Sequence, residues 1–361
     1  QGRLEEIREC IGCNICYSGD GKGTPIRCTQ NPTISEEWRR GWHPESFPPK
    51  HSDSTILVVG AGPAGLEATR ALGRRGYRVL LAESERELGG RVTRESRLPG
   101  LSEWARVKDY RIQQIQSMSN VDVYLDSGMN AEDVLAAETD HVVIATGAHW
   151  RGDGVGITRD TPIETFNLPG QIYTPDDIMS GRLPDGPTAI YDDDHYYMAS
   201  VIAEKLRSLN LPVTFITPKP VVCAWGEMTT EQARVQRRLL ELEVALFTSH
   251  NLTSFDGQEV LLECVYSQRS QSIAAEAVVT VTSRLPNDSL YHALQQSKNA
   301  NTQSRLKSIA RIGDCEAPAI IAGAVFAGHR YAREFETTID LDNPIKYDRV
   351  FFEDEMDHHS N

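Results

Sequence analysis

Two stretches of the chain share one pattern of hydrophobic and polar positions: a short apolar run, an amphipathic segment and a second apolar run. The first stretch reads STILVVGAGPAGLEATRALGRRGYRVLLAE, in which residues 56–59 and 77–81 predict buried parallel strands. Between them, the segment from Pro63 to Arg75 predicts a helix that stops at Gly76. Strand, helix and strand in this order predict a βαβ unit of a doubly wound sheet.

The turn after the first strand carries the spacing G-x-G-x-x-G. The first glycine makes the turn, the second admits a pyrophosphate, and the helix N-terminus supplies positive potential. Glu83 ends the second strand, where its carboxylate is placed to bond an adenosine ribose with a free 2′-hydroxyl. We therefore predict adenine-dinucleotide or nucleotide binding. The candidate residues are Gly60, Gly62, Pro63, Ala64, Gly65 and Glu83.

Two later segments are predicted to complete the same domain. HVVIATGAHW is a strand that ends at Thr146 and Gly147, and SIARIGDCEAPAIIAGAVFAGHRYAREFE is a strand that ends in Gly313-Asp314 before a long helix. Asp314 has two interpretations, a contact to the cofactor or an N-cap of the helix that follows. The glycine pair before Arg91 is compatible with either ADP or FAD. These segments add the candidate cofactor-binding residues Gly90, Arg91, Thr146, Gly147 and Asp314.

The second stretch, PTAIYDDDHYYMASVIAEKLRSLNLPVTFIT, repeats the strand–helix–strand pattern with a helix from Met198 to Leu209, but has no glycines. Carboxylates at residues 192–194 repel a pyrophosphate, and Tyr196 and Tyr197 occupy the volume that it needs. We predict a degenerate nucleotide-type fold that does not bind NAD(P)H. The acidic residues are interpreted as a solvated turn, with a metal site as the alternative.

Four of the seven cysteines lie in one short segment, CIGCNICYSGDGKGTPIRC. Disulfides between thiols three residues apart are strained, and structural zinc prefers two separated C-x-x-C pairs. The C-x-x-C-x-x-C run with one later cysteine fits an iron–sulfur cubane, with zinc as the alternative. The predicted ligands of a [4Fe–4S] cluster are Cys10, Cys13, Cys16 and Cys28.

Composition narrows the possible partners. The formal net charge of −14 argues against nucleic acid, whose phosphates require a basic surface. No apolar run approaches the length of a membrane span, so we expect none. The first residues, QGRLEEIREC, contain neither an initiator Met nor a signal peptide, and clustered thiols favour a reducing compartment. We expect a cytoplasmic protein that is a fragment or part of a longer polypeptide.

These patterns predict an α/β fold with an iron–sulfur loop segment and two Rossmann-like domains of the glutathione-reductase type, the second inserted in the first. The predicted iron–sulfur segment and connector cover residues 1–52. The nucleotide-binding domain covers residues 53–150 and 305–340, the degenerate domain covers residues 151–304, and a tail covers residues 341–361.

The chain resembles the C-terminal half of the trimethylamine and dimethylamine dehydrogenases. The motifs that carry the resemblance span almost the whole chain and are CIGCN, CTQN, RRGWHPE, VVGAGPAG, LPGL, EW, VIATGA, GD.EAP and GHR.ARE. The resemblance implies a [4Fe–4S] cluster on the four cysteines and ADP in the unit from Gly60 to Glu83, where related reductases hold FAD. One departure is Arg106, because the family carries an aromatic residue there.

The resemblance also implies a function. Oxidative N-demethylation of a methylated amine would occur at FMN on an N-terminal barrel, expected to be missing from this chain or a separate subunit, so no catalytic residue is nominated here. Electrons would pass through the cluster to an external acceptor such as an electron-transferring flavoprotein, within a homo-oligomeric assembly. The alternative is an FAD- and NADPH-dependent reductase module related to the 2,4-dienoyl-CoA reductases.

Overall fold

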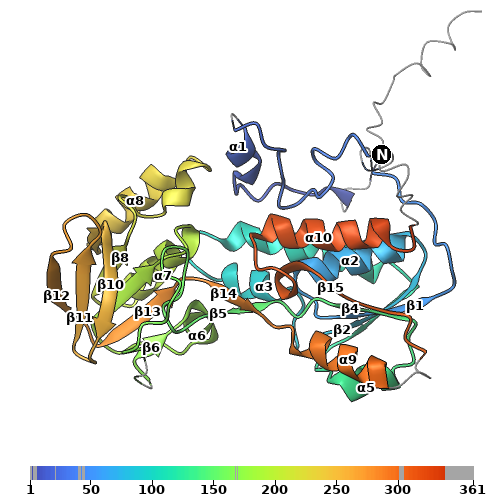
Figure 1. Cartoon of the computed structure of the whole chain (residues 1–361). Coiled ribbons are helices and arrows are strands. Elements are labelled where there is room, and N and C mark those ends of the chain that lie inside the picture. Colours follow the sequence, from blue (N-terminus) through green and yellow to red (C-terminus); the bar gives the residue numbers. More distant parts are fainter. Residues whose placement is uncertain are drawn as a thin grey trace, which may run out of the picture.

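The computed structural model describes residues 2, 6–20, 22–39, 42, 45–166, 168, 170–300 and 305–337. The predicted tail at residues 341–361 lies outside the described residues. The described chain forms two α/β lobes with the cysteine segment above them (Figure 1). None of its helices is long and apolar enough to cross a lipid bilayer.

The first sheet has five parallel strands in the order β15-β4-β1-β2-β3. The crossover helix α2 joins the neighbouring strands β1 and β2. This strand order and this crossover confirm the predicted doubly wound α/β class. The helix prediction is one residue too long, since α2 covers Pro63–Arg74. The strands are β1 (Thr55–Val59), β2 (Arg78–Ala82), β3 (Val121–Tyr124), β4 (His141–Ile144) and β15 (Ser308–Arg311).

Helices cover both faces of this sheet, which explains why β1 is apolar at consecutive positions. Ile56 and Val58 pack against the side that carries α2, α4 (Arg106–Gln116) and α10 (Ile321–Glu334). Leu57 and Val59 pack on the opposite side, beneath α5 (Ala131–Ala136) and α9 (Ser289–Ala300). The carboxyl ends of β1 and β4 therefore emerge between two layers of helices, where ligands bind in such folds.

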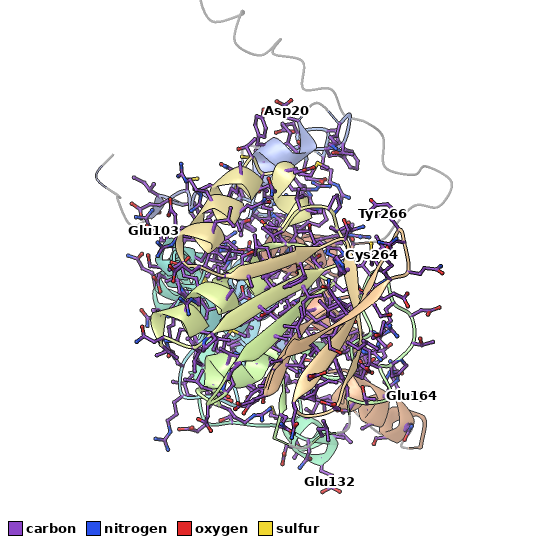
Figure 2. All side chains as sticks on the ribbon, turned by 90° about the vertical axis from the view of Figure 1, so that its left-hand side faces the viewer. Asp20, Glu103, Glu132, Glu164, Cys264 and Tyr266 are labelled. Atoms are coloured by element: carbon purple, nitrogen blue, oxygen red, sulfur yellow. The ribbon has the colours of Figure 1, made fainter. Side chains whose placement is uncertain are left out.

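The second parallel sheet has the order β6-β13-β7-β8-β9. Helices α7 (Tyr197–Ser208) and α8 (Gln232–Glu241) pack on one face, and an antiparallel meander of three strands packs on the other (Figures 1 and 2). The parallel strands are β6 (Ile172–Tyr173), β7 (Thr188–Asp192), β8 (Val213–Thr217), β9 (Ala245–Thr248) and β13 (Ala277–Val281). The meander contains β10 (His250–Phe255), β11 (Glu259–Cys264) and β12 (Ser270–Ala274).

A two-stranded antiparallel ribbon joins the lobes. The chain leaves the first sheet along β5 (Ala148–Trp150) and returns along β14 (Arg284–Pro286). We refer to the residues around the first sheet as the first unit and to those between β5 and β14 as the second unit. Shorter elements are α3 (Arg91–Glu95), α6 (Pro175–Ser180) and the 3₁₀ turns η2 (Ser102–Ala105), η3 (Ala224–Glu227) and η4 (Gly313–Cys315).

The cysteine segment is largely irregular and contains one short helix, α1 (Ile15–Gly19). It runs over α2 and α10 of the first unit and approaches α8 of the second (Figure 1). The connector that follows Cys28 carries several buried polar side chains, among them Gln30, Thr33 and Glu36.

Candidate functional site

The glycine turn between β1 and α2 is closed on one side and open on the other. Gly60 adopts a φ of 101°, and a Cβ there would lie 2.5 Å from the carbonyl oxygen of Ala145. A Cβ on Gly65 would lie 1.9 Å from the carbonyl oxygen of Gly60, so helix and strand pack too closely for a side chain. No atom lies within 4 Å of the Cβ position at Gly62. The turn therefore leaves room at Gly62 for a pyrophosphate.

The first turn of α2 faces this open space. Gly62 is the N-cap and has no side chain that could accept a hydrogen bond from the first turn. Pro63 is the first helical residue. The N–H groups of a first helical turn have no partner within the helix and favour an anion. Ala64 is buried against Gly313, and a Cβ on Gly90 would lie 2.9 Å from the Cα atom of Gly62. The structure thus brings six of the predicted residues together with Gly313, namely Gly60, Gly62, Pro63, Ala64, Gly65 and Gly90.

Glu83 is buried at the end of β2 and holds the glycine turn in place. Its Oε2 accepts a hydrogen bond from the N–H of Ala61 at 2.7 Å. Its Oε1 accepts from the hydroxyl of Ser84 and the N–H of Glu85, each at 3.0 Å. The predicted ribose-binding carboxylate therefore also fixes the loop that would hold the phosphates.

Asp314 joins the two units at the site. Its Oδ2 accepts hydrogen bonds from Arg91 at 2.7 Å and from Arg284 at 2.6 Å, and its Oδ1 accepts from the N–H of Ala319 at 2.9 Å. Arg91 also contacts Glu95 at 2.8 Å. Burial opposes the charge of Arg91, but Glu95 and Asp314 outweigh it and raise the pKa of the guanidinium. Sequence reasoning missed Arg284, which comes from the returning strand β14.

The interpretation of Asp314 as a helix cap is wrong. Asp314 lies in the 3₁₀ turn η4, whereas α10 begins at Ile321 with Ile320 as its N-cap. Residues 316–320 separate the two, so the carboxylate cannot reach the first turn of that helix as an N-cap does. Its partners are the two arginines and the backbone of its own loop.

Thr146 and Gly147 follow β4, where the chain leaves the first unit. The hydroxyl of Thr146 donates to the carbonyl oxygen of Asn287 at 2.6 Å. The N–H of Asn287 donates to the carbonyl oxygen of Gly147 at 2.9 Å. Both predicted residues are therefore joined to the returning chain just after β14, and Asn287 is a second contact that the sequence pattern did not reveal.

The four predicted cluster ligands are free thiols in a loop with converging N–H donors. The N–H of Gly12 points to Cys10 Sγ and the N–H of Asn31 points to Cys28 Sγ, each at 3.3 Å. Cys13 Sγ lies 3.1 Å from the hydroxyl of Thr29. Burial raises the pKa of the Cys13 thiol, and the neighbouring thiols of Cys28 and Cys10 raise it further. Binding of a cation would relieve this cost of forming thiolates.

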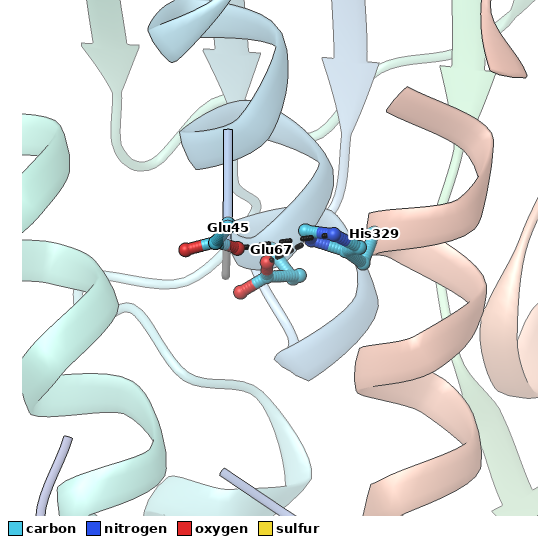
Figure 3. Close-up of side chains that lie close together, drawn as sticks. All are labelled: Glu45, Glu67 and His329. Atoms are coloured by element: carbon cyan, nitrogen blue, oxygen red, sulfur yellow. Dashed lines mark hydrogen bonds and ion pairs between the residues drawn. The ribbon is translucent and has the colours of Figure 1, made fainter. Parts of the chain in front are cut away.

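No three of these thiols lie within 4.8 Å of one another. Zinc–sulfur bonds of about 2.3 Å in a tetrahedron place the sulfurs about 3.8 Å apart. Among the residues that the structure describes, the one group with three ligand atoms within 4.8 Å of one another is Glu45, Glu67 and His329 (Figure 3). Glu67 in that group already pairs with Arg70 and Arg111, so it is a charge network in which no cation is needed.

Asp192 and Asp193 are buried and Asp194 is partly buried, which corrects the prediction of a solvated turn. Asp192 and Asp193 both have an exposed fraction of 0%. Asp193 accepts hydrogen bonds from the N–H groups of Thr158 and Arg159 and lies 3.0 Å from His195. Burial raises the pKa of Asp193, but the bonds from His195 and Thr158 outweigh burial and lower it. Burial and the neighbouring Asp194 raise the pKa of Asp192 well above its usual range.

Aromatic rings fill the space in front of α7. Tyr196 is the N-cap, and its ring centroid lies 4.6 Å from that of Trp225. Tyr197 packs edge-on against Trp104 at 4.7 Å and donates its hydroxyl hydrogen to Glu95 at 2.7 Å. Where α2 faces open space, α7 therefore faces packed side chains, as the sequence predicted for the two tyrosines.

The chain is similar to proteins of known families. Residues 58–126 match the model of an NAD(P)-binding Rossmann-like domain. Dimethylamine dehydrogenase from Hyphomicrobium sp. (strain x) is 37% identical over an alignment of 366 positions, gaps included, that covers 93% of this chain and 49% of that protein.

Two solved structures are similar as well. Histamine dehydrogenase from Rhizobium sp. 4-9 superimposes with a TM-score of 0.92 and 47% identity, covering 97% of this chain and 54% of that one. The 6-hydroxypseudooxynicotine amine oxidase from Pseudomonas geniculata N1 superimposes with a TM-score of 0.88 and 44% identity, covering 92% and 50%. This chain thus spans about half the length of each of these relatives.

Proposed function

This chain corresponds to the C-terminal region of the trimethylamine and dimethylamine dehydrogenase family, and from that premise we propose that it is the electron-transfer part of an amine-oxidising iron–sulfur flavoprotein. The observation that carries the proposal is the loop of four thiols, with its N–H donors, in a chain that aligns over 93% of its length with dimethylamine dehydrogenase. The proposed reaction is oxidative N-demethylation of a methylated amine.

The thiols fit a [4Fe–4S] cluster better than one zinc ion. No three of them come within 4.8 Å of one another, and a cubane spreads its ligands more widely than a single ion does. When bound, the cluster would supply one-electron transfer between FMN and an acceptor. Cys10, Cys13, Cys16 and Cys28 would hold it, and the N–H groups of Gly12 and Asn31 would stabilise charge on two of the sulfurs.

The glycine turn fits ADP. Gly62 and the first turn of α2 offer space and positive potential for the diphosphate, and Glu83 lies where a ribose hydroxyl would bind. Asp314, which would approach the side chain of a flavin, accepts hydrogen bonds from two arginines and one backbone N–H. Glu83 accepts three hydrogen bonds as well, so ADP is proposed over FAD from the family resemblance and not from this occupancy.

The rest of the assembly follows from the family. FMN and the amine site belong to an N-terminal barrel, which is either part of a longer chain or a separate subunit. We expect an electron-transferring flavoprotein as the acceptor, a homo-oligomer and a cytoplasmic location. The second unit would act as a scaffold that does not take up NAD(P)H, because Asp193 and the tyrosines fill the place of its phosphates.

The test is to purify the protein without oxygen, denature it, and identify the released nucleotide and metal. We expect ADP together with equal amounts of iron and acid-labile sulfide, four of each per chain as a [4Fe–4S] cluster requires. The Cys28→Ser variant should lose the iron and still bind added ADP, because its glycine turn is intact. Release of FAD, with bleaching by NADPH, would favour the reductase alternative, and one zinc without sulfide would disprove the cluster.

A further inference from the structure

A buried amide links the two ends of the cysteine loop. Gln30 lies two residues after Cys28 and is 2% exposed. Its Nε2 donates to the carbonyl oxygens of Glu9 and Arg106, each at 3.1 Å. Because Glu9 directly precedes Cys10, this side chain joins the segment that carries the first thiol to the segment that carries the last.

Arg111 fixes this amide from the opposite side. Arg111 is in α4, has an exposed fraction of 0%, and donates to both the side-chain and the backbone oxygen of Gln30 at 3.0 Å. Its Nε donates to Glu67 Oε2 at 2.8 Å. Multiple hydrogen bonds to a planar guanidinium define orientation as well as distance, so Arg111 sets the position of the backbone just after Cys28.

Glu67 carries the linkage into the helix whose first turn faces the proposed diphosphate. It lies on α2, two residues after Gly65, with an exposed fraction of 0%. Its Oε1 accepts from Arg70 at 2.7 Å. The same oxygen accepts from His329 Nδ1 at 2.8 Å (Figure 3). From Glu67 the backbone of α2 leads back to the glycine turn, and the hydrogen bonds from Glu67 through Arg111 to Gln30 are buried.

Two further contacts tie the same loop. Arg8 donates to the side-chain oxygen of Asn31 at 3.0 Å, and the N–H of Asn31 points to Cys28 Sγ. Arg106 donates to the carbonyl oxygen of Cys10 at 3.0 Å. The first contact joins residues beside Cys10 and Cys28, and the second joins Cys10 to α4. Arg8 is also linked to α2 through Glu45 and Arg70, but Arg8 and Glu45 are only partly buried, whereas Gln30, Arg111 and Glu67 are buried.

Resting on the function proposed above, we propose that Gln30 and Arg111 are positioning residues that couple cluster retention to nucleotide occupancy of the glycine turn. A nucleotide at the start of α2 restrains that helix, and the buried series transmits the restraint to the Cys10 and Cys28 segments. The thiols then remain at cluster spacing with less loss of conformational freedom. By linkage, the cluster must in turn strengthen nucleotide binding.

The experiment measures the rate of iron release to a chelator from anaerobically reconstituted protein, with and without saturating ADP. In the wild type ADP should slow the release. Gln30→Leu should release iron about 10- to 100-fold faster, as loss of an outer-sphere partner typically does, and ADP should no longer protect it. The electron paramagnetic resonance spectrum of the reduced cluster should change as well.

Gln171→Leu is the matched control, because the Gln171 amide also donates to two carbonyl oxygens, those of Gly257 and Glu276, but in the second unit. It should keep the wild-type release rate and the protection by ADP. If Gln30→Leu takes up no cluster, the Gln30→Glu variant provides the test. Its carboxylate retains an oxygen for Arg111 but lacks the N–H donors to the carbonyl oxygens of Glu9 and Arg106. This variant should release iron faster than the wild type and with weaker protection.

The outcomes separate this inference from the proposed function. A wild type that takes up no iron would overturn both. A wild type that holds iron, with Gln30→Leu and Gln30→Glu releasing it at the same rate and with the same protection by ADP, would overturn the inference alone. Equal loss of protection in Gln171→Leu would also overturn it, because the effect would then be a general consequence of deleting an amide that bridges two carbonyl oxygens.

Discussion

The two units contain the same strand–helix–strand arrangement, yet the N-termini of their helices have opposite surroundings. At α2, a Cβ on Gly62 would meet no atom within 4 Å. At α7, the N-cap is Tyr196, which packs on Trp225, and the next residue, Tyr197, packs on Trp104. One helix start is open to an anion, and the other is closed by aromatic rings.

In the second unit, backbone N–H groups near the end of β7 bind an anion that belongs to the protein itself. The carboxylate of Asp193, at the end of β7, accepts the N–H groups of Thr158 and Arg159, which are donors of the kind that a phosphate uses. Gly156 lies against the same carboxylate, since a Cβ there would be 2.3 Å from its Oδ2. The comparison teaches that the same strand–helix–strand arrangement can be closed at its helix start by an internal charge and packed side chains.

The largest effect that would test this comparison comes from the buried charge of the first unit. Glu67→Gln should destabilise the protein by about 3–5 kcal/mol at neutral pH, because Arg70 and Arg111 lose their buried counter-charge. Burial raises the pKa of Glu67, but the two arginines and His329 outweigh burial and hold it well below its usual range. Urea unfolding at several pH values measures the difference.

The sign of this pH dependence follows from the lowered pKa. The stability that ionised Glu67 contributes is present above the ordinary carboxyl pKa and is lost as the pH falls through the folded-state pKa. The gap between the wild type and Glu67→Gln should therefore shrink in acid. Glu204→Gln is the control, because its pair with Arg238 is exposed and should contribute little. A gap that widens in acid would contradict the role of Glu67.

Substitution of two glycines in the first unit tests helix packing and nucleotide binding separately. Gly65→Ala should cost about 3 kcal/mol, because the new Cβ meets the carbonyl oxygen of Gly60. Gly62→Ala meets no atom and should leave the stability unchanged, but lower the ADP affinity about tenfold, ~1.4 kcal/mol. Thermal unfolding and calorimetric titration measure the two effects. Unchanged ADP affinity in Gly62→Ala would place the diphosphate elsewhere.

The pH dependence of stability should have the opposite sign at Asp192, the buried acid of the second unit, from that at Glu67. The pKa of Asp192 is raised well above its usual range, so its contribution to stability is lost as the pH rises through the folded-state pKa. Asp192→Asn keeps the acceptor for the N–H of His195 and should stabilise the protein by about 2 kcal/mol at neutral pH. The two proteins should converge near pH 4. Destabilisation at neutral pH would show that the charge of Asp192 is needed.

The smallest expected losses of stability come from two helix caps, one in each unit, and should be equal. Asn130 caps α5 and Thr174 caps α6, each in a capping box with an aspartate at the third helical position. Replacing either residue by alanine should cost about 1 kcal/mol by thermal unfolding, because a helix cap is a local interaction. Saturating ADP should leave both differences unchanged. A cost confined to one unit would show that these caps depend on the wider fold.

Local features of both units could be predicted from the sequence. The helix predicted from Met198 to Leu209 is observed one residue earlier at both ends, and the glycine turn lies where its spacing placed it. Features that depend on distant segments could not be predicted. Arg284 meets Asp314 only because β14 returns beside β5, and Asp193 is buried because a loop 35 residues earlier covers it. Carboxylates are mostly exposed, so a solvated turn was the natural expectation.

The position of β15 at the edge of the first sheet has a consequence for biosynthesis. This strand pairs with β4, although the whole second unit lies between them in the chain. A ribosome therefore delivers the inserted unit complete before the outer unit receives its last strand and α10. The inserted unit is expected to fold first during translation, while the early strands of the outer unit wait for their partner and depend on chaperones for protection.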